Sequence, residues 1–202
     1  MLTRRNPQGF TLIELLITLS IVGILLAAGF PGFLAWMQNT HIRNSAESAL
    51  NGLALARTEA VRQNKTVNFQ LVTNVSSSCA LSVSGGSWVV SREDPSGKCN
   101  LPPAESLAPA NRVTPFIVQA RAGNDGAANA IVAAGQTTIT FNSLGQATNL
   151  GASPRSINVT NPKGGACAVD GGPMHCLRVD VTAAGQIRMC DPALTSTDPR
   201  AC

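Results

Sequence analysis

The chain contains no tyrosine, and aromatic residues make up only 4% of its 202 residues. A surface that binds nucleic acid by stacking bases on aromatic side chains is therefore not expected. Charged residues are also scarce at 13%, and the net charge of +4 is too small by itself to indicate a nucleic-acid-binding protein. The length fits one domain with an additional anchor segment.

Residues that carry out catalysis or hold metals are scarce as well. The two histidines are His41 and His175, and the chain has no G-x-S-x-G, phosphate-loop or H-E-x-x-H motif. Residues 124–126 (NDG) resemble the start of a calcium loop, but the further oxygen ligands and the closing glutamate are missing, which indicates a turn. We expect no enzyme activity, no cofactor and no metal site, and we expect His41 at a membrane surface rather than in a catalytic site.

One long uncharged stretch dominates the N-terminal part of the chain. No charged side chain occurs from Leu15 to Met37, and a helix needs roughly 20 mostly apolar residues to cross a bilayer. Arg4 and Arg5 precede this stretch, and a single carboxylate, Glu14, stands at its beginning. A carboxylate at bilayer depth costs about 2.5–3.5 kcal/mol on insertion scales, so its presence needs a reason.

Three interpretations of the stretch compete. A secretory signal peptide would end after small residues such as Ala27 and Ala28, but the acid and the continuing apolar run through Trp36 argue against it. A plain membrane anchor leaves the acid unexplained. Cleavage between Gly9 and Phe10 explains it, because the new amine at Phe10 is cationic at neutral pH and lies one helical turn from the acid. In a bundle, the acid of one copy then pairs with the amine of the next.

Residues 9–15 (GFTLIEL) closely resemble the class III leader and N-terminus of type IV pilins and type II secretion pseudopilins. The resemblance implies that a membrane prepilin peptidase cuts after Gly9 and methylates the new N-terminus at Phe10. It also implies that Glu14 assists the docking of subunits. A proline near the middle of the helix is typical of the family, and Pro31 occupies that place.

Two further segments resemble one branch of the family, the H-type pseudopilins and the fimbrial T and U minor pilins. They are residues 56–64 (ARTEAVRQN) and 185–192 (GQIRMCDP). The resemblance implies a minor type IV pilin that primes or tips pilus assembly. One alternative is the H-type pseudopilin of a type II secretion system, and another is a DNA-binding minor pilin for natural transformation.

The same resemblance implies a location and a set of partners. The protein is expected in the bacterial inner membrane, crossing it once with its C-terminal body in the periplasm, and then in a pilus or pseudopilus. The expected partners are the prepilin peptidase, other major and minor pilins or pseudopilins, the inner-membrane assembly platform and membrane lipid.

The chain is expected to have four parts: a leader peptide (1–9), a transmembrane half-helix (10–37), an amphipathic half-helix (38–64) and a β-rich body (65–202). Pro31 predicts a kink or a locally loosened segment in the helix. A stripe of apolar residues should face the body, because they recur every three or four positions. They are Ile42, Ala46, Ala49, Leu50, Leu53, Ala56 and Ala60. The charged residues opposite face either solvent or neighbouring subunits, and Asn64 is a plausible helix stop.

The body reads as an antiparallel arrangement of short strands, which gives an α+β fold of the pilin type. Strands are expected at 67–72, 80–83, 88–90, 113–119, 137–141, 157–160, 177–181 and 186–189. Residues 80–90 and 177–189 read as hairpins, because glycine lies between their two strands. Residues 92–111 and 122–130 read as loops.

Six cysteines, all beyond the uncharged stretch, predict disulfides in an oxidising compartment. No C-x-x-C spacing occurs, so a zinc site is not expected. Pairing of nearest neighbours gives Cys79–Cys99, Cys167–Cys176 and Cys190–Cys202. A bond between Cys176 and Cys190 is the main alternative.

The C-terminal hairpin carries the one further candidate site. Arg178 and Arg188, on facing strands, are positioned to contact phosphate groups of DNA. Some fimbrial T-type minor pilins resemble this arrangement and bind DNA through a Gly-Arg-x-Arg hairpin. Here residues 185–188 read GQIR, so only the second arginine of that motif is present. An ordinary solvated strand face is the alternative.

Overall fold

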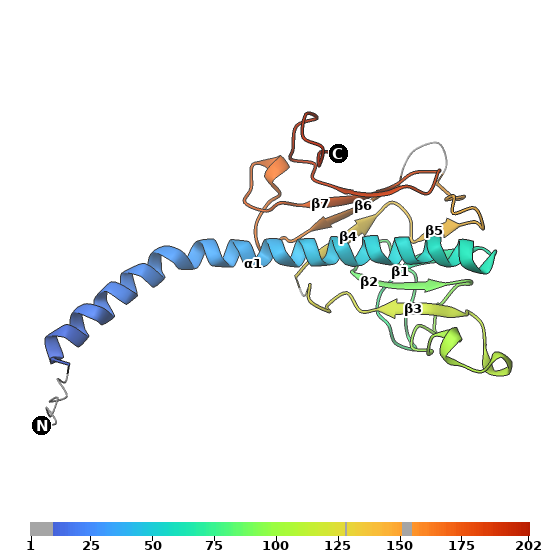
Figure 1. Ribbon diagram of the computed structural model, residues 1–202, viewed down its shortest axis with the longest axis horizontal. Coiled ribbons are helices and arrows are strands. Elements are labelled where there is room, and N and C mark those ends of the chain that lie inside the picture. The colour runs from blue at the N-terminus through green and yellow to red at the C-terminus, as the bar shows by residue number, and fades with distance from the viewer. Residues whose placement is uncertain (1–9, 128, 151–154) are drawn as a thin grey trace, which may run out of the picture.

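A long helix and two antiparallel sheets make up the structure, a computed structural model (Figure 1). It describes residues 10–127, 129–150 and 155–202, with the main chain alone at residues 28–31. The proposed leader with Gly9 lies outside the described residues, as does the side chain of Pro31. Helix α1 (Leu12–Gln63) runs out of the body at its N-terminal end; in the view of Figure 1, strands β2 and β3 lie below it and β6 and β7 above it. The predicted α+β class is confirmed.

Each sheet has four strands. The first has the order β3-β2-β1-β5 and consists of β1 (Val67–Val72), β2 (Ser87–Ser91), β3 (Ile117–Arg121) and β5 (Thr138–Phe141). The second has the order β4-β6-β7-β8 and consists of β4 (Ile131–Ala134), β6 (Arg155–Thr160), β7 (Leu177–Val181) and β8 (Ile187–Cys190). Three short 3-10 helices lie in the loops: η1 (Ala104–Ser106), η2 (Pro109–Asn111) and η3 (Ala168–Asp170).

The predicted hairpin of residues 80–90 is wrong. Residues 80–85 instead join the two sheets, because Leu81 bridges Val72 of β1 and Ser84 bridges Ala133 of β4. The Ser82 hydroxyl accepts a hydrogen bond from the Ser84 amide at 3.1 Å and donates one to the Ser84 carbonyl at 2.6 Å. Such local bonds compete with a regular strand ladder, which explains the difference.

Two other strands differ from prediction. β4 was not predicted, because its alanines have low strand propensity and its partner β6 is far away in sequence. β3 begins at Ile117 rather than residue 113, because Pro115 cannot donate a ladder hydrogen bond. The predicted C-terminal hairpin is confirmed by the pairing of β7 with β8.

Small residues let α1 lie close to the strands of both sheets. The fully covered positions recur at the predicted spacing, whereas Leu50 is only partly buried. They are Ile42, Ala46, Ala49, Leu53, Ala56 and Ala60. The helix ends at Asn64, whose φ of 50° is the left-handed conformation expected of a helix stop.

Hydrogen bonds fasten the helix at the point where it leaves the body. The side-chain amide of Asn161, fully buried, donates to the Gln38 side-chain oxygen at 2.7 Å and to the Gln38 carbonyl at 3.2 Å. The adjacent Asn39 accepts a hydrogen bond from the His175 amide at 2.8 Å, and Asn44, further along the helix, donates to the Gly126 carbonyl at 2.9 Å. These bonds hold the helix in place on the body at the point from which its N-terminal half projects.

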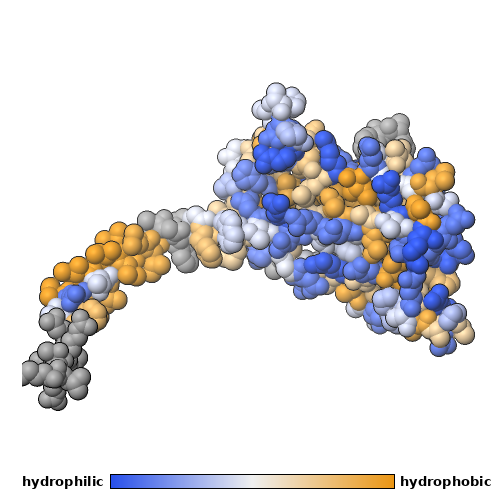
Figure 2. Space-filling view, in the orientation of Figure 1, coloured by the Kyte–Doolittle hydropathy of each residue, from blue (hydrophilic) through white to orange (hydrophobic). Residues whose placement is uncertain are grey.

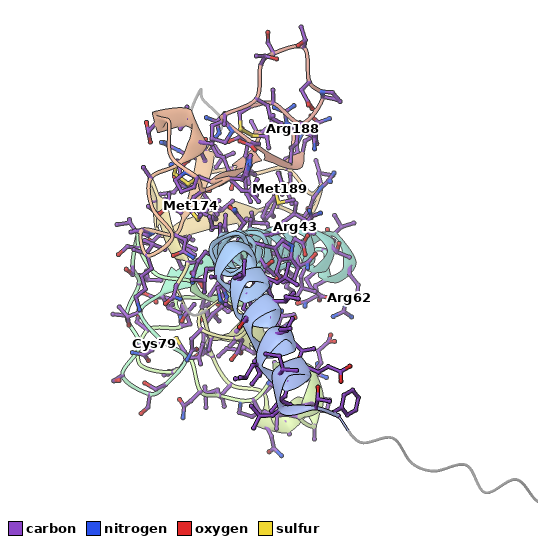
Figure 3. All side chains as sticks on the ribbon, turned by 90° about the vertical axis from the view of Figure 1, so that its left-hand side faces the viewer. Arg43, Arg62, Cys79, Met174, Arg188 and Met189 are labelled. Atoms are coloured by element: carbon purple, nitrogen blue, oxygen red, sulfur yellow. A yellow bond between two sulfur atoms is a disulfide. The ribbon has the colours of Figure 1, made fainter. Side chains whose placement is uncertain are left out.

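Disulfides join neighbouring cysteines in the structure. Cys79 is bonded to Cys99, Cys167 to Cys176, and Cys190 to Cys202. The third bond ties the C-terminal tail to the end of β8, where Asp191 also bridges Ala201. Figure 3 shows Cys79 on the far side of α1 from Arg188, so disulfides brace both layers of the body. A disulfide typically stabilises a fold by about 2–4 kcal/mol.

Gly52 gives a direct test of the close packing of α1. A Cβ atom at this position would lie 2.7 Å from the Phe69 ring and 3.0 Å from the Trp88 ring. Both rings are almost fully buried, so neither can move aside freely. We predict that Gly52→Ala destabilises the protein by about 1 kcal/mol, since an overpacking cost of about 1–3 kcal/mol outweighs a gain in helix propensity of about 1 kcal/mol.

Urea unfolding of the purified protein in detergent micelles measures the effect. The matched control is Asn51→Ala, at an exposed position on the same turn, which should be neutral or slightly stabilising. Equal stabilisation by both substitutions would contradict the packing account.

Candidate assembly site

The N-terminal half of α1 is apolar and exposed on all sides. This half projects away from the strands (Figure 1), and its large side chains are each at least half exposed: Leu12, Ile13, Leu15, Leu16, Ile17, Leu19, Ile21, Val22, Ile24, Leu25 and Leu26. Figure 2 shows this half as an apolar rod beside a mixed, largely polar body. A helix that is apolar all round needs a membrane or other protein chains to cover it.

The helix is bent between its two halves. Segments Leu12–Ala27 and Gly32–Gln63 make an angle of 41°. Within the described residues no single straight helix is long and apolar enough to cross a membrane, whereas this bent pair is, by length and composition. The bend lies where Pro31 was expected to produce one, although its side chain is outside the described residues.

The first turn of α1 has a defined cap. Thr11 is in an extended conformation (φ −81°, ψ 153°), and its side chain accepts a hydrogen bond from the Glu14 amide at 3.3 Å. The pattern T-x-x-E is the capping box, a signal that our sequence analysis overlooked. A carboxylate in the first turn also suits the positive end of the helix dipole. Glu14 is therefore at a favourable position for the helix, and its side chain remains exposed.

Glu14 has no cation within the part of the chain that the structure describes. None of the salt bridges among residues 10–127, 129–150 and 155–202 includes it. Phe10, directly before the cap, is 86% exposed. The apolar rod thus carries at its tip, beside the proposed cleavage site, an acidic group that no described residue pairs with.

The charged face of the C-terminal half of α1 is not simply solvated. Arg43 and Glu47 form an exposed pair at 2.9 Å, as a solvated face requires. By contrast, Glu59 is buried, and the Arg62 guanidinium donates to its carboxylate at 2.7 Å. Arg57 donates to the Gly145 carbonyl at 3.2 Å. Part of this face therefore holds loops of the body in place.

The two histidines form no metal site with the described residues. His41 Nδ1 lies 3.2 Å from the Gly126 carbonyl, and His175 Nδ1 lies 3.4 Å from a carboxylate oxygen of Asp191. No group of three or more potential metal ligands occurs in the described part of the chain.

The C-terminal hairpin does not present two free arginines. Arg178 lies opposite Cys190, and Arg188 lies opposite Asp180, so the four side chains share one face of the sheet. Arg178 Nε is 3.0 Å from the Asp180 carboxylate, which also accepts a hydrogen bond from the Ser156 hydroxyl at 2.7 Å. A carboxylate thus stands between the two arginines and opposes phosphate binding.

Comparison with known proteins places the chain in a family. The family model of the type II transport protein GspH matches residues 45–193, and that of the prokaryotic N-terminal methylation motif matches residues 4–30. Two crystal structures of the type IV minor pilin FimU from Pseudomonas aeruginosa are similar, at 16% and 17% identity and TM-scores of 0.47 and 0.48. The matches cover 79% and 80% of this chain and 98% and 94% of the FimU chains. No curated protein matches the sequence.

Glu59 makes the stability of the body depend on pH. The hydrogen bond from Arg62 lowers the pKa of the Glu59 carboxyl below its ordinary value of 4.5, outweighing the opposite effect of burial. Since the folded pKa is lower than the unfolded one, the stabilisation is fully present above about pH 4.5 and is lost as the pH falls through the folded pKa. We predict that Glu59→Gln lowers the Tm at pH 6 by a few degrees, and that this difference shrinks toward pH 3.

Circular dichroism melts at several pH values measure this difference. Glu47→Gln serves as the control, because its exposed pair contributes little at any pH. A Tm difference for Glu59→Gln that stays constant from pH 6 to pH 3 would rule out the ionised carboxylate as its source.

Proposed function

Because this chain belongs to the family of the type II transport protein GspH and carries a prokaryotic N-terminal methylation motif, we propose that it is a minor type IV pilin that primes or tips a pilus. Its role within the minor pilin and pseudopilin class is structural. It is a membrane-anchored subunit that is processed as a prepilin and associates with other pilins.

The proposal assigns a role to each part of the chain. Residues 1–9 are the leader, which prepilin peptidase removes by cutting between Gly9 and Phe10 before Phe10 is methylated. Residues 10–37 cross the inner membrane once, with Arg4 and Arg5 on the cytoplasmic side as the positive-inside rule requires. Residues 38–64 lie on the body, and residues 65–202 form the body in the periplasm.

The exposed half of α1 is the observation that carries this proposal. Lipid tails cover it while the subunit waits in the membrane. Lipid tails are about as apolar as leucine side chains, so exchanging them for the helices of other subunits involves little change in hydrophobic energy. The inner-membrane assembly platform is the proposed agent of this exchange. The filament core then consists of these half-helices, and the bodies form its surface.

Glu14 favours the filament over the membrane as the environment of the helix. In the membrane its charge is costly, by about 2.5–3.5 kcal/mol on insertion scales. In the filament, we propose, it pairs with the α-amine at Phe10 of a neighbouring subunit, and the two charges cancel. The capping box supports this role, because it holds the helix start in a defined conformation directly beside the cleavage site.

The bend in α1 contributes to the same step. A proline inside a helix removes one hydrogen bond and loosens the turn before it. We propose that Pro31 causes the 41° bend and lets the apolar half adjust to its neighbours after leaving the membrane. The protein works by binding other subunits, with no turnover of a substrate.

A pseudopilin of a type II secretion system is the second candidate, and the description of the matched family favours it. The physics of anchoring and docking is the same in both machines. Binding of DNA through Arg178 and Arg188 is not proposed, because Asp180 lies between them.

We predict that Glu14→Ala leaves cleavage intact and lowers incorporation into filaments more than tenfold, since a charge pair of about 2.5 kcal/mol corresponds to more than a factor of ten. Gel mobility reports cleavage, and the amount of the protein in sheared filaments reports incorporation. The control is Glu47→Ala, which removes an exposed acid from the same helix. Normal incorporation of the Glu14→Ala variant would contradict the proposed charge pair.

A deletion strain distinguishes a pilus from a secretion system when surface filaments and secreted enzymes are measured in the same culture. In a deletion strain, loss of surface filaments with normal secretion of enzymes identifies a minor pilin. Loss of secretion with normal surface filaments identifies a pseudopilin and overturns the first proposal.

A further inference from the structure

A pocket of about 330 Å³ lies at the end of the body farthest from the membrane half of α1. The last turn of α1, the η1–η2 loop and the start of β3 form its walls, and Figure 1 shows these elements side by side at the end opposite the N-terminus. Four basic side chains line it: Arg62, Lys65, Arg92 and Arg112. We refer to it as the distal basic pocket. Glu105 is its one acidic lining residue.

The four cations differ in what they already bind. The Arg62 guanidinium donates to Glu59 at 2.7 Å and also to Glu105 of η1. Lys65, Arg92 and Arg112 take part in none of the salt bridges formed within the described part of the chain. A protein with a net charge of +4 thus gathers three uncompensated cations in one hollow.

The pocket is also built at a conformational cost. Phe116 has a φ of 54°, a conformation that is rare for a bulky L-residue. Its ring lies under the Arg92 guanidinium, 4.7 Å from ring centroid to guanidinium carbon. Strained residues persist where the surrounding structure holds them, and they gather at ligand sites. Here the strain places an aromatic platform that orients Arg92 at the pocket.

Glu105 indicates which ligand chemistry the pocket accepts. Its carboxylate reaches across from η1 to Arg62, so the pocket already holds one carboxylate of its own chain. Arginine guanidinium groups match carboxylates geometrically and bind them through charge-assisted hydrogen bonds. The three remaining cations have no carboxylate partner among the described residues, so they are available to bind carboxylates from outside the chain.

We propose that the distal basic pocket binds an acidic segment, bearing aspartate or glutamate, of the neighbouring subunit that lies ahead of this one in the priming or tip complex, farther from the membrane. The inference rests on the proposed function, because the direction of stacking follows from the membrane half of α1. In a head-to-tail assembly, the far end of one body meets the near end of another. A nucleic acid fits less well, since its backbone needs an extended basic track, whereas this is a single hollow with Glu105 among its lining residues.

A labelled acidic peptide tests the pocket without requiring filament assembly. The probe is fluorescein-labelled (Gly-Glu)5, with (Gly-Gln)5 as the uncharged peptide, and the full-length protein is kept in non-ionic detergent. We expect (Gly-Glu)5 alone to raise the anisotropy, and 0.5 M salt to abolish the signal. Lys65→Gln combined with Arg112→Gln should weaken binding at least tenfold.

Two further variants make the test specific. The matched control, Arg121→Gln with Lys163→Gln, removes the same charge at exposed positions elsewhere and should leave binding within twofold. Glu105→Gln removes the one carboxylate that lines the pocket and should strengthen binding severalfold, because Arg62 then pairs with Glu59 alone and the net positive charge of the pocket rises. An equal loss of peptide affinity in the pocket variant and in the control would overturn the proposal. An unchanged peptide affinity in the pocket variant, or in Glu105→Gln, would also overturn it.

A labelled 20-base-pair DNA duplex is tested in parallel. Loss of duplex binding in the pocket variant with unchanged peptide binding would show a phosphate site and overturn the proposal. These results are independent of the filament assay on Glu14. If the peptide does not bind, the pocket proposal fails and the proposed pilin function is unaffected. If Glu14→Ala is incorporated normally, the proposed charge pair fails and the peptide result still reports on the pocket.

Discussion

The uncovered half of α1 is the constraint on which the rest of the structure depends. About half of the helix lies on the body, where Ile42, Leu53 and their alanine neighbours are fully buried. The other half, from Leu12 to Ala27, is exposed and is covered by none of the described residues. Such a surface is stable only in lipid or among other helices. In the assembly that we propose, the membrane anchor and the filament contact are one surface used at two times, and the carboxylate of Glu14 distinguishes the two environments.

The body holds that helix in place at one end and, in the assembly that we propose, meets another subunit at the other. Alanines and Gly52 bring the helix close to the sheets, while Asn161 and Gln38 fix the point where it leaves them. At its far end, Arg62 pairs with the buried Glu59 of the same helix and also with Glu105 of η1, which ties the helix end to the body. Beyond that pair lies the distal basic pocket, with the strained Phe116 and the stacked Arg92. The membrane end of the molecule is thus apolar and its far end basic, which suits a subunit that stacks in one direction.

The sequence predicted the features that local patterns determine. The helix over 11–63, its buried stripe and its end at Asn64 follow from periodicity and capping, and the C-terminal hairpin follows from alternation around Gly185. Features set by distant contacts were missed. β4 depends on pairing with β6, and residues 80–83 were predicted as a hairpin strand because nothing local reveals that residues 80–85 bridge two sheets. The distal basic pocket was also missed, because its cations are spread from Arg62 to Arg112 and meet only in the fold. The capping box at Thr11 was visible in the sequence as T-x-x-E.

A photoreactive phenylalanine analogue placed at Leu19, in the middle of the uncovered half, tests the central claim most directly. After filaments are sheared from cells and irradiated, the account predicts a cross-link between this position and the N-terminal helix of another pilin. The same analogue at Asn51, exposed on the covered half, should give no cross-link to that helix. Irradiated membranes should show Leu19 linked to lipid before assembly. If position 19 in sheared filaments is cross-linked only to lipid and never to another subunit, the account is contradicted.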